Sequence, residues 1–183
     1  MPAPSEAELR DTVDDVALRA LISNYADVVN RRTWAEFDDL FLPEASIILD
    51  LGDRPPMVFT GPSEIGTFIG GALEQYPFFE FVALNVRTML RVGGDIDRAH
   101  LRTYMCELRQ DHAGAPSRAF GLYQDDVVRT PVGWRFAARR YCSIGRGEYG
   151  LDLMPPPVIQ DPVEAESIVD PRPVAAGPAS VDD

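Results

Sequence analysis

The chain has 183 residues, 45% of them hydrophobic, and a formal net charge of −12, which suits a single globular domain. The charge argues against a nucleic-acid partner, because phosphate binding needs clustered Lys and Arg, and no apolar run approaches the ~20 residues of a membrane helix. The acidic start "MPAPSEAELRDTVDD" lacks the apolar core of a signal peptide, so we expect a cytoplasmic protein with no membrane partner.

The first part of the chain predicts three helices. From Glu6 to about Val29, apolar residues recur at spacings of three and four. The stretch "RRTWAEFDDLF" predicts a short second helix, in which Thr33 is the N-cap and Glu36 completes a capping box. The stretch "GPSEIGTFIGGALEQY" predicts a third helix, which Ser63 can cap.

The remaining elements are predicted strands. Two short ones, "ASIILDL" and "MVFT", precede the third helix. After Pro77 the hydrophobic period changes to two, and four longer strands follow: "FFEFVALNVRTMLRV", "RAHLRTYMCELRQ", "RAFGLYQDDVVRT" and "WRFAARRYCSI". This order predicts an α+β fold, in which helices cover one face of a curved, mostly antiparallel sheet and leave a cavity with one open mouth.

The composition changes after about residue 150. We expect one domain over residues 5–150. Residues 151–183 are rich in proline and acidic residues and contain no aromatic residue, which is typical of a tail that is disordered or draped over the domain.

The sequence gives no sign of a metal or cofactor site. No Cys/His cluster has zinc spacing, and no phosphate-binding glycine loop occurs, so we expect no cofactor. His100 is a candidate base, because histidine titrates near neutrality. In its strand, however, Ala99, Leu101 and Met105 form the apolar row and His100 lies in the other. We therefore expect His100 to point away from the cavity, as an exposed or interface residue.

Four stretches, "ISNYADVVNRRTWAEFDDLF", "FTGPSEI", "GLYQDDVVRT" and "GWRFAARRY", together resemble the SnoaL-like branch of the NTF2-like superfamily across about residues 8–146. The resemblance implies an α+β cone, in which three N-terminal helices and a curved sheet enclose a pocket. The superfamily includes scytalone dehydratases, dehydrochlorinases and ketosteroid isomerases, together with members that have no known activity, so the fold does not choose a function.

Comparison with the dehydratases and dehydrochlorinases concerns an Asp–His dyad. The resemblance places Asp27 at the aspartate, Asn85 at the Asn of H-x-x-x-N, and Arg139 at a strand arginine. The position of the histidine is occupied by Phe81. We expect Asp27 to point into the cavity, bonded to Arg139 or a tyrosine hydroxyl, and to act directly or through water. The alternative is a structural aspartate paired with Arg139, Arg31 or a loop amide.

Comparison with ketosteroid isomerases concerns an oxyanion hole. The resemblance places Tyr25 at its helix tyrosine and Asp125 at a strand aspartic acid that an apolar site keeps protonated. Tyr123 shares a strand face with Asp125. The alternative for Asp125 is a cross-strand pair with Arg139.

The sequence therefore predicts a small-molecule-binding NTF2-like protein. If it is an enzyme, it is a cofactor-independent lyase or isomerase for an apolar substrate, with Asp27 as proton acceptor and Tyr25 as electrophile. The expected ligand-binding residues are Phe81, Asn85, Tyr123, Asp125, Arg139 and Trp34. The alternative is a non-catalytic binding or assembly module, which the absence of the dyad histidine favours. Apolar residues on both rows of the strand over 78–92 predict a homodimer or higher oligomer joined through the outer sheet face.

Overall fold

A computed structural model describes residues 3–147 and 152–153 of the chain, so most of the predicted tail lies outside the described residues. The helices are α1 (Glu6–Arg31), the 3₁₀ helix η1 (Trp34–Asp39), α2 (Gly61–Leu73) and the 3₁₀ helix η2 (Val92–Gly94). The strands are β1 (Phe41–Asp50), β2 (Met57–Thr60), β3 (Phe78–Leu90), β4 (Arg98–Gln110), β5 (Pro116–Thr130), β6 (Gly133–Gly147) and β7 (Asp152–Leu153).

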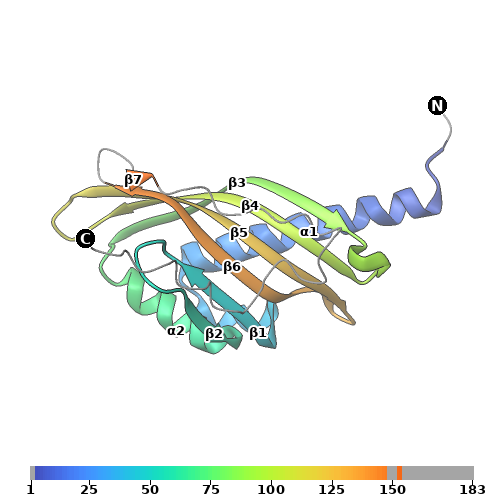
Figure 1. Cartoon of the computed structure of the whole chain (residues 1–183), viewed down its shortest axis with the longest axis horizontal. Coiled ribbons are helices and arrows are strands. Elements are labelled where there is room, and N and C mark those ends of the chain that lie inside the picture. The colour runs from blue at the N-terminus through green and yellow to red at the C-terminus, as the bar shows by residue number, and fades with distance from the viewer. Residues whose placement is uncertain (1–2, 148–151, 154–183) are drawn as a thin grey trace, which may run out of the picture.

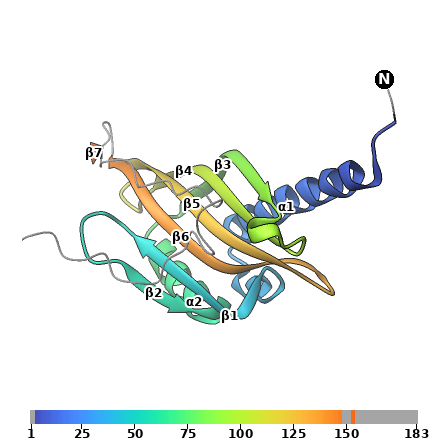
Figure 2. The same cartoon turned by 45° about the vertical axis from the view of Figure 1, so that its right-hand side comes forward.

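The strands form one curved sheet in the order β2-β1-β6-β5-β4-β3, with β7 paired to β6. All neighbouring strands are antiparallel except β1 and β6, which are parallel. Helices α1 and α2 lie on the same side of this sheet (Figure 1), and the turned view shows the sheet bending around them (Figure 2). The predicted α+β arrangement is confirmed.

Helix α1 begins with a reciprocal capping box, in which Ser5 accepts from the amide of Glu8 and the Glu8 carboxylate accepts from the amide of Ser5. Its first turns extend beyond the sheet (Figure 1). Leu9, Val13 and Val16 are therefore exposed, although their spacing predicts an apolar face. The second half of the helix carries most of the residues that it buries, which are Leu18, Leu21, Ile22, Tyr25, Val28 and Val29 together with Asp14.

Two predicted helix starts differ in part from the structure. Thr33 is the N-cap residue of η1, as predicted, but its side chain makes no capping hydrogen bond, and the Glu36 carboxylate accepts from Arg31 instead of closing a capping box. Helix α2 begins at Gly61, two residues before Ser63. Gly61 has a φ of 75°, and a Cβ there would overlap the carbonyl oxygen of Pro43, so only glycine fits this start.

Strand β3 contains a bulge that exchanges its two faces. Ala83 pairs with Met105 and Asn85 with Tyr104, which leaves Leu84 as an extra residue. Ala83 packs on the core before the bulge and Val86 packs on it after the bulge. Asn85 is exposed. The prediction that Asn85 shares the cavity face of Phe81 is wrong for this reason.

Strand β3 is an edge strand of the sheet and is held to α1 by Asn30. The side-chain amide of Asn30 donates to the carbonyl of Phe81 at 3.1 Å, and its oxygen accepts from the Phe81 amide at 2.7 Å. These bonds satisfy backbone groups that an edge strand would otherwise leave unpaired. Asn30 thereby fixes Phe81 against the end of α1.

His100 lies on the sheet face away from the helices, as predicted, but it is buried rather than exposed. Its Nδ1 is 2.5 Å from Oδ1 of Asp126 on β5. This pair is separated by the sheet itself from the cavity described below.

Candidate functional site

A cavity of about 340 Å³ lies between α1, α2, β1 and the concave face of the strands β3–β6. Its volume falls at the lower end of the ~300–1,000 Å³ usual for ligand pockets. Most of its wall is apolar. The polar residues that line it are Tyr25, Arg54, Gln75, Tyr76, Glu107, Arg109, Tyr123, Arg139, Tyr141 and Arg146.

Arg139 forms the inner end of the cavity and is only 2% exposed. Its guanidinium carbon lies 4.0 Å from the ring centroids of Tyr25 and Phe136 and 4.4 Å from that of Tyr123. Nε and Nη2 donate to the two oxygens of Asp125 at 2.7 and 2.9 Å. The remaining nitrogen, Nη1, is buried and has no partner in hydrogen-bonding geometry among the described residues.

The sheet register explains why Arg139 points inward. Asp125 and Arg139 are directly opposite on β5 and β6, so their side chains share a face. An extra residue at Ala137, between the pairs Asp126–Ala138 and Val127–Phe136, puts Phe136 on that face as well. With Phe41 of β1 at 5.7 Å, the aromatic rings around the guanidinium thus come from four elements, namely α1, β1, β5 and β6.

Asp125 does not line the cavity, which corrects the prediction that it contacts the ligand. It is fully buried, and both of its oxygens accept from Arg139. Burial raises the pKa of Asp125, and the Arg139 guanidinium opposes that rise. Both carboxyl oxygens accept from the Arg139 guanidinium, which keeps its proton in proteins. Asp125 therefore does not present to the cavity the hydrogen bond that the comparison with ketosteroid isomerases predicted, and instead holds Arg139 in place.

Three of the four tyrosines that line the cavity are buried, namely Tyr25, Tyr123 and Tyr141. The hydroxyls of Tyr25 and Tyr123 are 3.4 Å apart, and the rings of Tyr123 and Tyr141 lie with centroids 5.2 Å apart. Burial raises the pKa of Tyr25 and Tyr123, and raises that of Tyr141 to about 12. All three keep their protons near neutral pH and can donate hydrogen bonds. The sequence-predicted residues Tyr25, Tyr123, Phe81 and Arg139 all line this cavity.

The ring of Tyr141 lies across Gly121 of the neighbouring strand. A Cβ at Gly121 would overlap Cε2 of that ring, and Cζ and the hydroxyl oxygen would be 2.7 and 2.8 Å away. The backbone at Gly121 does not require a positive φ. Glycine is needed here to make room for the tyrosine ring.

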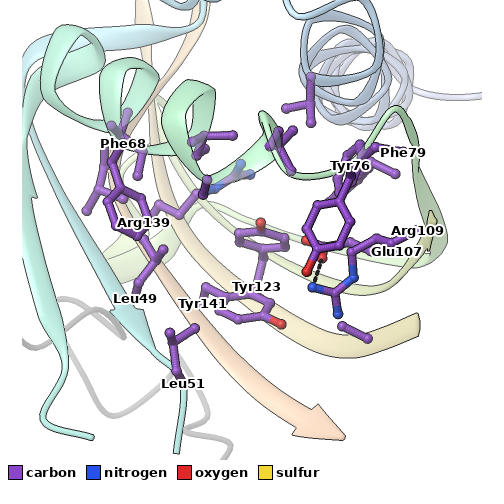
Figure 3. A pocket seen from close by; sticks show the side chains of 18 of the residues that line it. Leu49, Leu51, Phe68, Tyr76, Phe79, Glu107, Arg109, Tyr123, Arg139 and Tyr141 are labelled. Carbon is purple, nitrogen blue, oxygen red and sulfur yellow. Dashed lines mark ion pairs between the residues drawn. The ribbon is translucent and has the colours of Figure 1, made fainter. Parts of the chain in front are cut away.

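Glu107 is the carboxylate that faces the cavity, and one row of the sheet places it there. The row crosses four strands as Phe81, Glu107, Ala119 and Arg146, and all four residues line the cavity. Glu107 Oε2 is 3.7 Å from Nη1 of Arg109 (Figure 3), a loose ion pair. Burial raises the pKa of Glu107, and Arg109 and Arg146 only partly oppose this. In Figure 3 the Glu107 and Arg109 side chains lie beside the Tyr76 ring.

Sequence reasoning missed Glu107 and Arg109, although a signal was present. Both continue the row of β4 that begins with Ala99 and Leu101, so strict alternation carries that row into the cavity wall. Arg146 could not be found in this way. An extra residue at Ile144 shifts the register of β6 and turns Arg146 inward.

The chain matches the SnoaL-like domain family over residues 10–140. It belongs to that family. No curated protein matches the chain in sequence. Among solved structures, a scytalone dehydratase-like protein from Novosphingobium aromaticivorans is 14% identical, with a TM-score of 0.67, and the alignment covers 83% of this chain and 98% of that one. A hexachlorocyclohexane dehydrochlorinase from Novosphingobium barchaimii is 14% identical with a TM-score of 0.66, covering 81% and 99%.

An NTF2-like protein with a cystatin-like fold, also from Novosphingobium aromaticivorans, is 20% identical with a TM-score of 0.63, and the alignment covers 75% of this chain and 86% of that one. These likenesses show that the SnoaL-like chain has the NTF2-like fold that its sequence predicts. None of the helices described above combines the length and apolar character needed to cross a membrane. Within the described ranges, no three His, Cys, Asp or Glu side chains are grouped as a metal ion would require.

In this SnoaL-like protein Asp27 lies outside the cavity, which corrects the central sequence prediction. Its carboxylate is 61% exposed and accepts from Nε of Arg31 at 2.7 Å. Helical geometry is the cause. Asp27 is two positions after Tyr25, a rotation of about 200° around the helix, so the two side chains lie on opposite sides. Since Tyr25 is buried on the core side, Asp27 must face solvent.

Trp34 also lies outside the cavity, contrary to prediction. It is half-buried at the start of η1 and packs against Gly66 and Gly70 of α2. The residue of η1 that turns inward is Phe37, whose ring stacks on Tyr25 with centroids 5.5 Å apart. The tight 3₁₀ turn thus assigns Trp34 to the outer side of α2.

Proposed function

We propose that this protein binds a small molecule in the cavity and acts on it as a lyase or isomerase, by proton transfer between the ligand and Glu107. The observation that carries the proposal is the Glu107 carboxyl, which lines the cavity and has a pKa raised by burial. A general acid or base is most effective when its pKa lies near the working pH, and burial moves a carboxyl in that direction.

The inner end of the cavity supplies the complementary electrophilic groups. Nη1 of Arg139 and the hydroxyls of Tyr25 and Tyr123 are hydrogen-bond donors around the same space. A carbonyl oxygen bound there would be stabilised as it gains negative charge during proton removal from the adjacent carbon. Fixed donors in a buried site stabilise such charge strongly, because they need no reorganisation during the reaction. Asp125 keeps the guanidinium oriented for this role.

In this proposal Glu107 replaces the acid–base group that the sequence comparison sought at Asp27. Proton transfer then takes place between Glu107 and the carbon next to the bound carbonyl. Loss of a leaving group from the following carbon would make the reaction an elimination. Return of the proton at a different carbon would make it an isomerisation. The fold likeness to a dehydratase-like protein and a dehydrochlorinase supports the first outcome.

A non-catalytic binding protein is the second candidate. Phe81 at the position of the dyad histidine and the exposed location of Asp27 favour it. In that case the cavity would hold a ligand unchanged, and Glu107 would serve only as a hydrogen-bonding group.

Deuterium exchange distinguishes the two functions without knowledge of the natural substrate. The protein is incubated in D₂O with a panel of small β-hydroxy and β,γ-unsaturated ketones, and NMR follows exchange at the carbon next to the carbonyl. The wild type should accelerate exchange, and Glu107→Gln should lose at least ~100-fold of that acceleration. Glu80→Gln on β3, which lies outside the cavity, is the matched control and should keep the activity.

Two outcomes would contradict the proposal. Saturable ligand binding by the wild type without any exchange would favour the binding protein. Full exchange activity in Glu107→Gln would remove Glu107 from the mechanism.

A further inference from the structure

We infer that the natural ligand is an amphipathic carboxylate, whose anionic group binds Arg109 and Arg146 while its apolar body occupies the inner cavity. The inference rests on the cavity being the ligand site proposed above, but not on the reaction. It names the substrate class from the charges and shape of the cavity wall.

The charges at the two ends of the cavity differ. At the inner end Arg139 is neutralised by Asp125 through two hydrogen bonds. At the outer end the wall contains Arg54, Arg109 and Arg146. The inner end is therefore suited to a neutral polar group such as a carbonyl, and any permanent anion belongs at the outer end.

Two described carboxylates lie near the three outer arginines. Arg54 pairs with Asp53 through contacts of 2.8 and 3.1 Å. Arg109 has Glu107 at 3.7 Å, beyond hydrogen-bonding distance. Arg146 contributes to lowering the pKa of Asp53, for which Arg54 is the main cause. Among the side chains that the structure describes, Asp53 and Glu107 are the carboxylates nearest these three guanidinium groups, so a carboxylate of a ligand would find cationic partners here.

Arg109 and Arg146 are placed to act on one anion. Arg146 is two strands from Glu107 in the same row, with the small Ala119 between them. Arg109 is two residues from Glu107 on the same face of β4. Burial raises the pKa of Tyr141, and both guanidinium groups oppose that rise, so both lie near this one side chain.

An unused donor points to a missing partner at this place. Nε of Arg109 is buried and has no hydrogen-bond partner within the described part of the chain. The guanidinium of Arg146 donates from Nε to Ser143 and from Nη2 to the carbonyl of Leu51, which fixes the orientation of the group. This local positive charge is found in a chain with a net charge of −12. Surface repulsion would exclude an anion elsewhere, so the arginines provide selectivity as well as affinity.

The rest of the wall describes the body of the ligand. Between the outer arginines and Arg139, the cavity is bounded by Leu49, Ile65, Phe68, Ile69, Leu73 and Phe79 among other apolar side chains. A ligand that fits is a compact hydrocarbon or aromatic body with a carboxylate at one end and an oxygen acceptor at the other.

Matched pairs of probes test this. Binding of naphthoate and naphthamide, phenylacetate and phenylacetamide, and octanoate and octanamide is measured by isothermal titration calorimetry at low salt. The members of each pair have nearly the same shape and differ in charge. We expect at least one pair to bind with the carboxylate favoured by ~10-fold or more, as charge-assisted hydrogen bonds to arginine imply. The preference should shrink as salt is added.

Variants assign the preference to the two arginines. In the double variant Arg109→Gln/Arg146→Gln, the carboxylate and the amide of each pair should bind with about equal affinity. The affinity for the amide should stay within a factor of ~3 of the wild-type value. Arg87→Gln, on the exposed outer side of β3, removes the same type of charge outside the cavity and should keep the preference. Unchanged affinity for the amide also shows that the double variant is folded.

Equal or weaker binding of the carboxylates, absence of binding by all three pairs, or a preference that survives the double variant would each overturn the inference. The reaction is tested separately. Glu107→Gln should retain the carboxylate preference in this assay even if it abolishes proton exchange. A failure of the acid–base proposal therefore leaves this result intact, and the reverse also holds.

Discussion

The guanidinium of Arg139 and the carboxylate of Asp125 form two hydrogen bonds, at 2.7 and 2.9 Å, with neither side chain more than 2% exposed. A pair so deeply buried is costly to leave half-made, because the remaining charge has neither water nor a counterion. Its stacking among Tyr25, Tyr123 and Phe136 fixes the inner end of the cavity.

Breaking this pair should destabilise the protein strongly. Asp125→Asn leaves the guanidinium buried with a neutral neighbour, and we expect a loss of about 3–5 kcal/mol in the free energy of unfolding. Replacing both residues, as Asp125→Leu with Arg139→Met, should recover much of that loss, since no buried charge remains. Urea unfolding of the two variants and the wild type measures the difference. A double variant as unstable as Asp125→Asn would show that shape, not charge, dominates.

Glu107 should make stability depend on pH. Its pKa is raised in the folded state by burial, so the folded protein holds this proton more tightly than the unfolded chain. The stabilisation is fully present below the unfolded pKa of ~4.3 and is lost as pH rises through the folded pKa. Glu107→Gln removes this loss. We expect the variant to melt above the wild type at neutral pH and together with it near pH ~4.

A thermal melting series from acid to neutral pH measures this effect. Glu80→Gln is the control, because Glu80 is exposed on the same sheet, and its melting difference from wild type should not follow the same pH dependence. A melting temperature of Glu107→Gln below that of the wild type at neutral pH would mean that the contact with Arg109 outweighs the cost of burial.

Asp27 should be dispensable. Its carboxylate contacts Arg31 on the solvent side of α1 and has no path to the cavity. Asp27→Asn should change the melting temperature by no more than about 2 °C and ligand affinity by less than about twofold. Calorimetric binding and thermal melting provide the two measurements. A loss of ~100-fold in proton exchange would restore the role that the family comparison assigns to this residue.

Asn30 should be more important than its exposed position implies. Two hydrogen bonds join it to the backbone of Phe81 on the edge strand. We expect Asn30→Ala to cost about 1–3 kcal/mol and to speed hydrogen exchange of the Phe81 amide. Asn24→Ala, exposed on the same helix, is the control and should leave both unchanged. Equal exchange rates at Phe81 in the wild type and Asn30→Ala would show that other contacts hold β3.

The order and type of the elements could be predicted because hydrophobic period and turn residues are local properties. The period changes near Pro77: α1, η1 and α2 precede that change, and the four longest strands, β3 to β6, follow it. Whether an individual side chain points into or away from the cavity was harder to predict from the sequence. Bulges at Leu84, Ala137 and Ile144 exchange the faces of β3 and β6, and the alternation of apolar residues does not reveal their positions.

The error at Asp27 has a different origin. The position that the family resemblance assigns to Asp27 conflicts with the phase of the helix, because Tyr25 and Asp27 cannot both face the core from one helix. Glu107 has no counterpart in the family comparison, but alternation along β4 predicts that its side chain lies in the cavity wall. Local geometry was the better guide at both positions, and the family resemblance was the better guide to the overall fold.

The absence of a side chain at Gly121 sets the position of the Tyr141 ring, and through it the space inside the cavity. Tyr141 lies flat on that strand because nothing projects beneath its ring. Any larger residue at 121 would displace the Tyr141 ring and so change the space available to a ligand, without replacing Glu107 or either outer arginine. Divergence at such a supporting position offers related proteins a way to change the length of molecule they accept while the acid–base and anion-binding residues stay the same.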